Sequence, residues 1–417
     1  MTDILSDSDH GSRQAVLPET DVPETGSYKK TLRFYYLYVF SYDFIFGYAI
    51  FPAFFQLEGS SPEMVGAILA FWAACIIVFE VPSGLLADIL NRRTLLVAAP
   101  LLKGVCFLIW IFADGHPWMY FLGMAFWSLA SALRSGTKEA LLYDHVTANH
   151  KAPEYTAILG RERAFQEGAT LLGAAAGGFI AAQNLEAAFW MSLIPLSMCA
   201  VSALHLKDLR KERKIGHLPS FALAPALIRT TWTEYVSKPE IGRITLYVAL
   251  CVTFLSTLED FNQLFLLAID MPVWSIGLSV AIMGLARLFL AYHSGWLERY
   301  PAFDWAGPLV CGGALFLSGF LSPAYSLLAM ASAYILTAPL MVLTMSRFQK
   351  ALDGEGRATA TSVLSVFMEA LSLVFSIAIA VLFSQLTVLK TYQICGVYLA
   401  VFAVWEMTRK STRSAPG

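Results

Sequence analysis

The sequence predicts an all-α integral membrane protein with twelve transmembrane helices, arranged as two pseudo-symmetric six-helix bundles. Hydrophobic residues make up 57% of the 417 residues, and the mean hydropathy is +0.59. Both values exceed the usual level of a soluble domain. Twelve apolar runs follow one another along the chain, long enough to cross about 30 Å of hydrocarbon as helices.

The twelve runs divide six and six around a charged segment that starts at Lys207. We interpret as spans residues 32–55, 64–86, 94–113, 118–143, 164–184, 187–206, 244–269, 273–295, 306–322, 324–345, 358–385 and 391–407. The spans predict an N-terminal bundle (31–206), a cytoplasmic connector (207–243) and a C-terminal bundle (244–407), flanked by a disordered acidic tail (1–30) and a short tail (408–417). Four connector residues at helical spacing predict a helix along the membrane surface: Ile228, Trp232, Tyr235 and Val236.

The distribution of basic residues predicts the orientation of the spans. Of the 29 Lys and Arg residues, 24 lie in the tails, the connector and the loops of one side, whereas the opposite loops hold only Lys390. Basic residues are retained on the cytoplasmic side of short loops. Both termini are therefore expected in the cytoplasm, and the first 30 residues lack the features of a cleaved signal peptide.

Several functional classes lack support in the sequence. The net charge of −2 comes with no basic patch for nucleic acid. All six cysteines fall within predicted spans, which argues against disulfides and thiolate metal sites. No ATP-binding glycine loop, hydrolase motif or metalloprotease motif occurs. We expect no enzyme activity, no cofactor and no metal, and the expected partners of a monomeric chain are a small-molecule substrate, protons and the lipid bilayer.

A small charged hinge lies between the second and third spans and reads Gly84-Leu-Leu-Ala-Asp88-Ile-Leu-Asn91-Arg92-Arg93. The hinge resembles the signature of the major facilitator superfamily, G-x-x-x-D-R/K-x-G-R-R/K, from which Ile89 and Asn91 depart. Asparagine tolerates positive φ better than most residues, so we expect the turn to survive. The resemblance covers residues 31–407. It implies a latch on the cytoplasmic side, formed by Gly84, Asp88, Arg92 and Arg93, whereas an ordinary positive-inside loop would explain the two arginines alone.

Further segments resemble the same superfamily. Residues 79–84 and 135–144 are similar to one prokaryotic-type branch with broad substrates. In the fifth span, Gly173-Ala174-Ala-Ala-Gly177-Gly178 resembles the antiporter motif G-P-x-x-G-G, with alanine where proline is usual. The resemblance implies two six-helix halves that rock around a midplane site, and the glycines favour export by exchange. Alternatively, the small residues serve only close helix packing.

Four acidic residues at bilayer depth are candidates for proton coupling, because a charge there costs at least about 2.5 kcal/mol. Asp43 is the twelfth residue of the first span, roughly 16 Å from its cytoplasmic start. Glu259 and Asp260 are about 100° apart around the seventh span, so at most one, with Glu259 preferred, is expected to face the cavity. Glu369 is predicted to face a water-filled cavity, or else a serine-lined helix interface. It lies on a polar stripe with Ser362, Ser365, Ser372 and Ser376.

Arg134 in the fourth span and Arg287 in the eighth are candidate substrate anchors, since a guanidinium binds carboxylates and phosphates in bidentate fashion. The alternative is that each arginine neutralises a buried acid. Lys103 in the third span is expected to form a structural pair or to snorkel. Three more residues are candidates for substrate contact: Tyr36 and Phe40 on the Asp43 side of the first span, and Gln263 one turn from Glu259 and Asp260.

The leading hypothesis is a secondary active transporter that moves a small amphipathic or anionic organic compound by alternating access, as a proton-coupled antiporter for efflux. The alternatives are a proton-coupled symporter for uptake of an organic anion or chelate, and a non-transporting membrane receptor on a transporter fold. An enzyme is disfavoured because no span presents a nucleophile, a base and an orienting group on one face. By resemblance, the multi-pass protein is expected in a bacterial inner membrane.

Overall fold

The computed structural model describes residues 25–209, 239–352 and 357–414, and within these ranges the chain forms helices and no strands. The N-terminal half contains α1 (Thr25–Asp43), η1 (Phe46–Ala49), α2 (Phe51–Leu57), α3 (Pro62–Ile89), α4 (Arg92–Ile111), α5 (Pro117–Arg134), α6 (Thr137–Ala148), η2 (Ala152–Glu154), α7 (Tyr155–Gln183) and α8 (Leu185–Leu204). The C-terminal half contains α10 (Pro239–Tyr247), η3 (Val248–Val252), α11 (Thr253–Glu259), α12 (Asn262–Ala268), α13 (Val273–Tyr292), α14 (Ser294–Leu297), α15 (Phe303–Ser318), α16 (Pro323–Ala351), α17 (Arg357–Gln385) and α18 (Val388–Ser414). The predicted all-α class is confirmed.

The helices follow the twelve predicted spans. Within the described ranges, nine helices are long and apolar enough to cross a membrane, and the shorter apolar helix α15 makes a tenth candidate. The remaining two crossings, the fourth and the fifth, do not meet this criterion of length and apolar composition. The fourth span is divided into α5 and α6, and α7 carries Arg161, Glu162, Arg163 and Glu167 in its first half.

The first crossing and the seventh, its counterpart in the second half, are both broken beside an acidic residue. In the first, α1 ends at Asp43 and the chain resumes as η1 at Phe46. In the seventh, α11 ends at Glu259 and α12 begins at Asn262, after a π-helical turn at η3. Interruptions of this kind are frequent at functional sites. The shared break fits the predicted pseudo-symmetry of the two bundles.

The fourth crossing was expected to be one continuous helix over residues 118–143, and this expectation is wrong. The helix stops at Arg134, and a new helix starts at Thr137. Between them Gly136 has φ +70°, a left-handed conformation that glycine adopts without steric cost. The break places the last residue of α5 and the first turn of α6 in different orientations.

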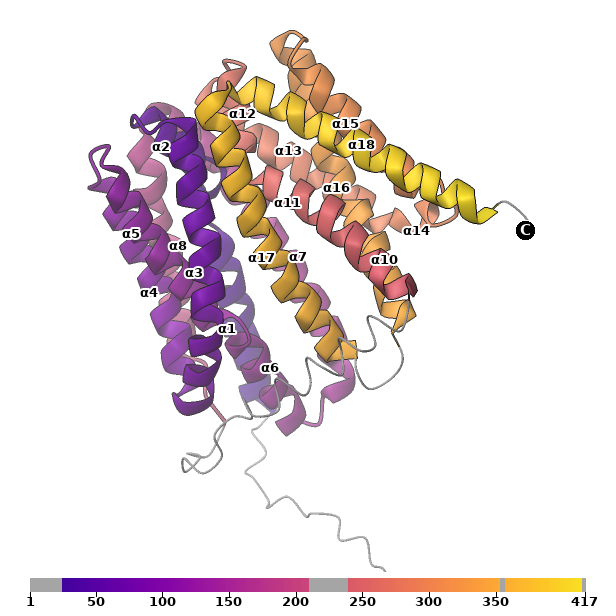
Figure 1. Ribbon diagram of the computed structural model, residues 1–417. Coiled ribbons are helices and arrows are strands. Elements are labelled where there is room, and N and C mark those ends of the chain that lie inside the picture. The colour runs from indigo at the N-terminus through magenta and orange to yellow at the C-terminus, as the bar shows by residue number, and fades with distance from the viewer. Residues whose placement is uncertain (1–24, 210–238, 353–356, 415–417) are drawn as a thin grey trace, which may run out of the picture.

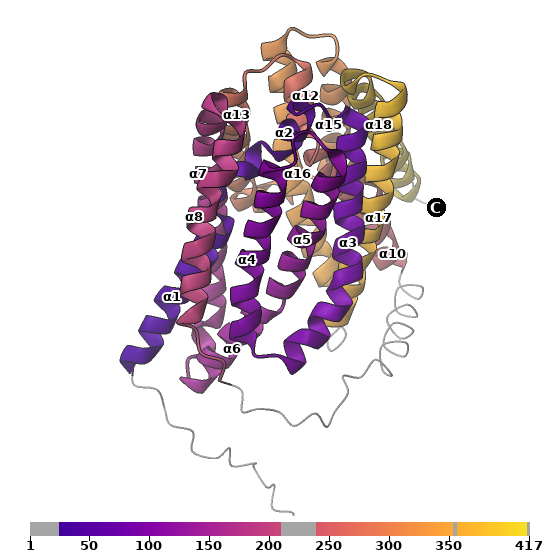
Figure 2. The ribbon, with the colours of Figure 1, turned by 90° about the vertical axis from the view of Figure 1, so that its left-hand side faces the viewer.

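Two long helix pairs join the halves, with α3 packed along α17 and α7 along α13. We call the end where α8 finishes and α10 begins the connector end, and the opposite end, where α2 contacts α12, the far end. The halves meet at the far end and diverge toward the connector end (Figure 1). The turned view shows α8, α4, α5 and α3 side by side, with α6 at the connector end (Figure 2).

Two predicted boundaries need correction. The first helix begins at Thr25, so residues 25–30 belong to α1 and not to the tail, because Tyr28 is buried in the core of the N-terminal half. The last helix continues past residue 407 to Ser414, and Glu406 near its end is buried beside Arg243. Residues 1–24 and the connector helix proposed around Ile228 and Trp232 lie outside the described residues.

Candidate functional site

A buried ion pair forms where the first crossing breaks. Asp43, the last residue of α1, accepts from Arg134 of α5 at 2.9 Å and from the Gln166 amide of α7 at 3.1 Å. Only 14% and 12% of the Asp43 and Arg134 side chains are exposed. Arg134 ends α5, where a cation interacts favourably with the helix dipole, and its guanidinium lies 4.1 Å from the centre of the Tyr42 ring. Three separate helices therefore converge on one carboxylate.

A second cation lies beside this pair. Lys103 of α4 is completely buried. Its ammonium donates to the Tyr42 carbonyl at 3.4 Å and to the Tyr48 hydroxyl, and it lies over the rings of Tyr42, Tyr48 and Trp127. The side chain is buried in the bundle, so the expectation of snorkelling is wrong, and its structural contacts are with a carbonyl, a hydroxyl and aromatic rings instead of an acid.

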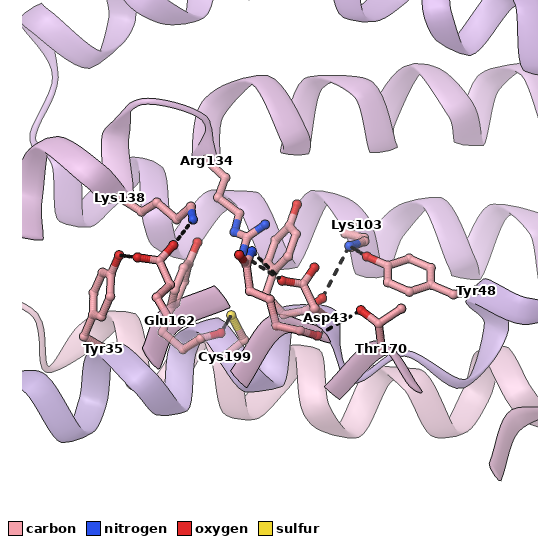
Figure 3. Close-up of polar contacts among 12 residues, drawn as sticks. Tyr35, Asp43, Tyr48, Lys103, Arg134, Lys138, Glu162, Thr170 and Cys199 are labelled. Carbon is pink, nitrogen blue, oxygen red and sulfur yellow. Dashed lines mark hydrogen bonds and ion pairs between the residues drawn. The ribbon is translucent and has the colours of Figure 1, made fainter. Parts of the chain in front are cut away.

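A second charged group lies one helical turn closer to the connector end. Glu162 of α7 forms an ion pair with Lys138 of α6 and accepts from the Tyr35 hydroxyl of α1 at 2.6 Å. Lys138 also contacts Glu139 at 3.0 Å. Figure 3 shows the order along the bundle, with Tyr35, Glu162 and Lys138 on one side, Arg134 and Asp43 in the middle, and Lys103 with Tyr48 on the other side.

Sequence reasoning missed Glu162 and Gln166. The predicted fifth span began at residue 164, so Glu162 was assigned to a polar loop, whereas α7 begins at Tyr155. The usable signal was the spacing of the two residues, because positions i and i+4 share one helix face. Together they form the polar face that α7 presents to α1 and α6.

The C-terminal half contains one predicted acid paired with one predicted arginine. Arg287 of α13 donates to Glu259 at 2.7 Å, and its guanidinium lies 4.5 Å from the centre of the Tyr334 ring. The other Glu259 oxygen is buried and has no hydrogen-bond partner in the described chain. Arg134 and Arg287 thus each neutralise an acid in this conformation, which agrees with the alternative interpretation of the two arginines.

Arg287 also lines a cavity of about 460 Å³ between the halves. Ligand sites of drug-sized molecules fall within roughly 300–1,000 Å³. Helix α7 contributes Glu167 and Thr170, while α13 and α16 contribute Arg287 and Tyr334. The other lining residues are mostly apolar: Leu171, Ala174, Val280, Gly284, Leu288, Ala291, Ala338, Met341 and Val342, together with Arg163. The cavity therefore combines a mostly apolar wall with three charged side chains, Arg163, Glu167 and Arg287.

The other predicted site residues lie apart from these two ion pairs. Asp260 has no ion pair among the described residues. Glu369 is exposed on α17, and the negative charge of Glu80 on α3 repels its carboxylate. The serine stripe does not share one environment, because Ser372 accepts from Thr257 of α11 at 2.9 Å whereas Glu369 is exposed. The side chain of Ser362 lies outside the described residues. Three further candidates belong to neither ion pair. Gln263 is buried and its side-chain oxygen has no hydrogen-bond partner among the described residues, Tyr36 packs on Phe165, and Phe40 packs on Phe44.

The hinge before α4 contacts its own half. Arg92 pairs with Asp144 of α6 at 2.5 Å, and its backbone N–H donates to Asp208 at 2.8 Å. Asn91 has φ −64°, so the positive φ expected there is wrong. Its side chain instead caps α4 by accepting from the backbone N–H of Arg93. The side chain of Asp88 lies outside the described residues, and the latch role of Gly84, Asp88, Arg92 and Arg93 stays a prediction.

The glycines of α7 allow two close backbone contacts. A Cβ on Gly173 or Gly177 would lie 2.8 or 1.9 Å from the carbonyl oxygens of Ile45 and Phe46, in the break that follows Asp43. A Cβ on Gly178 would lie 3.0 Å from Gly277 of α13, in the other half. These glycines therefore do allow close helix packing, and whether they also serve exchange stays a prediction.

Comparisons with known proteins agree on one family. The family model described as Major Facilitator Superfamily matches residues 34–377. An "Uncharacterized MFS-type transporter YfkF" of Bacillus subtilis (strain 168) is 30% identical over 200 residues, which cover 45% of this chain and 49% of that protein. The matched region thus spans about half the length of that relative.

Solved structures share the fold. The crystal structure of a point mutant of the nucleoside transporter NupG aligns with a TM-score of 0.74 at 12% identity, over 91% of this chain and 99% of that chain. A POT family transporter in complex with 5-aminolevulinic acid gives 0.69 at 13% identity, over 93% and 96%. A D-xylose-proton symporter gives 0.63 at 12% identity, over 90% and 96%. Each of these proteins is a transporter.

Proposed function

Because this chain belongs to the major facilitator superfamily and is a membrane transporter, we propose that it is proton-coupled and exports a small amphipathic or anionic organic compound in exchange for protons. Asp43 carries the proton in this proposal, and the cavity beside Arg287 receives the compound. The connector end, with both termini, lies in the cytoplasm of a bacterium whose inner membrane holds the protein.

The observation that carries the proposal is the buried pair of Asp43 and Arg134 at the break of the first crossing. A carboxylate at this depth has two low-energy states, one paired with a cation and one protonated. Protonation of Asp43 would release Arg134 and loosen the contact between α1 and α5. A proton on Asp43 and a substrate in the cavity beside Arg287 would then favour different arrangements of the helices, which is the requirement for exchange.

Packing links this carboxylate to the contact between the halves. The residues that follow Asp43 lie against Gly173 and Gly177 of α7, and the next glycine of α7 lies against α13. Movement of the break on protonation would therefore reach the far-end contact through one rigid helix. Alternating access needs such a link between the coupling site and the rocking of the halves.

A second candidate is proton-coupled uptake of an organic anion. It is favoured by Arg287, which lines the cavity while it pairs with Glu259. Protonation of Glu259 would free Arg287 for a substrate carboxylate, so that proton and anion would bind together. The two candidates differ in the direction of proton flow.

Reconstituted liposomes with a pH dye inside separate the candidates. Wild type and the variants Asp43→Asn and Glu259→Gln are compared with Asp114→Asn, an exposed loop position, while organic acids and amphipathic drugs are added outside. Substrate entry with a rise of internal pH indicates antiport, and entry with a fall indicates symport. We expect the rise, and its loss in Asp43→Asn but not in Asp114→Asn. Substrate entry without any pH change would refute proton coupling.

A further inference from the structure

The group around Glu162 contains more acid than base. Its two carboxylates, Glu162 and Glu139, share the single ammonium of Lys138. Glu162 and Lys138 are 5% and 9% exposed, whereas 41% of the Glu139 side chain is accessible. One Glu139 oxygen is nevertheless buried without a hydrogen-bond partner among the described residues. Two carboxylates that share one ammonium leave an excess negative charge, which is unfavourable next to a buried carboxylate, and binding one proton removes it.

The neighbouring group has the opposite excess. There the single carboxylate of Asp43 lies beside two cations, Arg134 and Lys103. Among the described residues Lys138 is the cation that forms an ion pair with Glu162, while Arg134 near Tyr35 and Arg161 near Tyr36 form no ion pair with it. The side chains that face Glu162 from surrounding elements are Tyr35 and Tyr36 of α1, Arg134 of α5, Lys138 and Glu139 of α6, and Tyr155 of α7.

The two groups are connected through α7 and through the broken fourth crossing, α5 and α6. Glu162 and Gln166, which contacts Asp43, are four residues apart on α7, or about 6 Å along the axis. Lys138 and Arg134 lie on either side of the break in the fourth crossing. The Glu162 group is the one nearer the connector end and includes the partly exposed Glu139. It therefore lies between the Asp43 pair and that end of the molecule.

We propose that Glu162 is a second proton-binding site, which exchanges protons between Asp43 and the connector end of the molecule. The proposal rests on the proton coupling proposed above. In the unprotonated state Glu162 accepts from Lys138 and Tyr35. When a proton binds its carboxylate, Lys138 keeps the Glu139 carboxylate as its partner, so no charge is left unpaired and the group becomes neutral. On release, the proton returns to water at the connector end.

Glu162→Gln is the first test, since glutamine keeps an acceptor for Lys138 and Tyr35 but binds no proton. Purified protein without substrate is titrated by infrared difference spectroscopy, which detects the carbonyl stretch of a protonated carboxylic acid. We expect wild type and the exposed control Glu154→Gln to show a band that Glu162→Gln lacks. An identical band in all three proteins would overturn the proposal.

Liposome assays supply the second readout. Glu162→Gln is expected to slow substrate transport driven by a pH gradient roughly tenfold or more. Exchange of substrate for labelled substrate needs no net proton movement, so it should keep the wild-type rate. An equal loss of both activities would indicate a purely structural residue and contradict the proposal. If wild type moves no protons at all, coupled transport fails, and the infrared band alone decides whether Glu162 binds a proton.

Tyr35→Phe keeps the test decisive should Glu162→Gln fail to fold. This change removes the 2.6 Å hydrogen bond that stabilises the Glu162 carboxylate, so the infrared band should appear at higher pH than in wild type. A titration unchanged from wild type would count against Glu162 as the source of the band.

Discussion

Lys103 shows how a single buried charge is accommodated in the N-terminal half. Its ammonium has no carboxylate within ion-pair distance among the described residues, and its partners are a carbonyl, a hydroxyl and three aromatic rings. Cation–π contacts with desolvated rings contribute about 2 kcal/mol or more. They offset part of the cost of burying the charge, and the hydroxyl of Tyr48 supplies the remaining directed contact.

Tyr48→Phe is expected to lower the thermal unfolding midpoint in detergent, because it leaves the buried ammonium with one acceptor fewer, at a cost of about 1–3 kcal/mol. Lys103→Met has similar volume and removes the charge, so its midpoint should equal or exceed that of wild type. In the Lys103→Met background, Tyr48→Phe should have little further effect. A penalty of full size in the double variant would show that Tyr48 stabilises the fold independently of Lys103.

At the scale of helices, α7 connects most of the features described above. One face carries Glu162 and Gln166 toward the N-terminal half, and its glycines touch both the break after Asp43 and helix α13. The contact to Phe46 is the tighter one, since a Cβ on Gly177 would lie 1.9 Å from a backbone oxygen. No rotation of a side chain can relieve such a clash.

Gly177→Ala is therefore expected to displace α7 or the broken segment and to cost about 1–3 kcal/mol or more, with transport reduced as well. Gly168→Ala on the same helix is the matched control, because nothing lies within 4 Å of the added Cβ. That change should raise stability by up to about 1 kcal/mol through helix propensity. Thermal unfolding and substrate exchange measure both variants, and equal behaviour of the two would argue against the close contact at Phe46.

The helices could be predicted from sequence better than their interruptions. The length of an apolar run shows whether a segment can cross the hydrocarbon, and the helices of the described residues are consistent with the twelve predicted spans. The breaks at Asp43 and Glu259 depend on packing between segments far apart in the chain, which a single run does not encode. The charged part of α7 led to the opposite error: the run Arg161-Glu162-Arg163 resembles a loop, yet it lies inside α7, where Lys138 neutralises Glu162 and Tyr35 donates a hydrogen bond to it.

For the molecule as a whole, the two halves are alike in fold, and both bury ion pairs. The N-terminal half contains the pairs formed by Asp43 and by Glu162, and the C-terminal half contains Asp304 with Arg347 and Glu406 with Arg243. The pair of Arg287 and Glu259 differs in position, because Arg287 lines the cavity between the halves. This position could not be predicted from sequence, since charged residues occur in both halves. In the function proposed above, protons bind in the N-terminal half and the substrate binds at the junction.

The far-end contact should control the balance between conformations. A Cβ on Gly277 would lie 2.3 Å from the Ala174 carbonyl and 2.8 Å from the Gly178 Cα, so Gly277→Ala should disfavour the conformation in which the halves meet there. A cost of about 1–3 kcal/mol corresponds to roughly a five- to 150-fold change in the ratio of two conformations. With spin labels at Leu57 of α2 and Ser322 before α16, the distance distribution of the variant should contain a longer-distance component that is absent or minor in wild type. Gly284→Ala is the control on α13, because its Cβ would meet only the flexible end of Leu171, and an identical distance distribution in both variants would mean that the glycine contact does not hold the halves together.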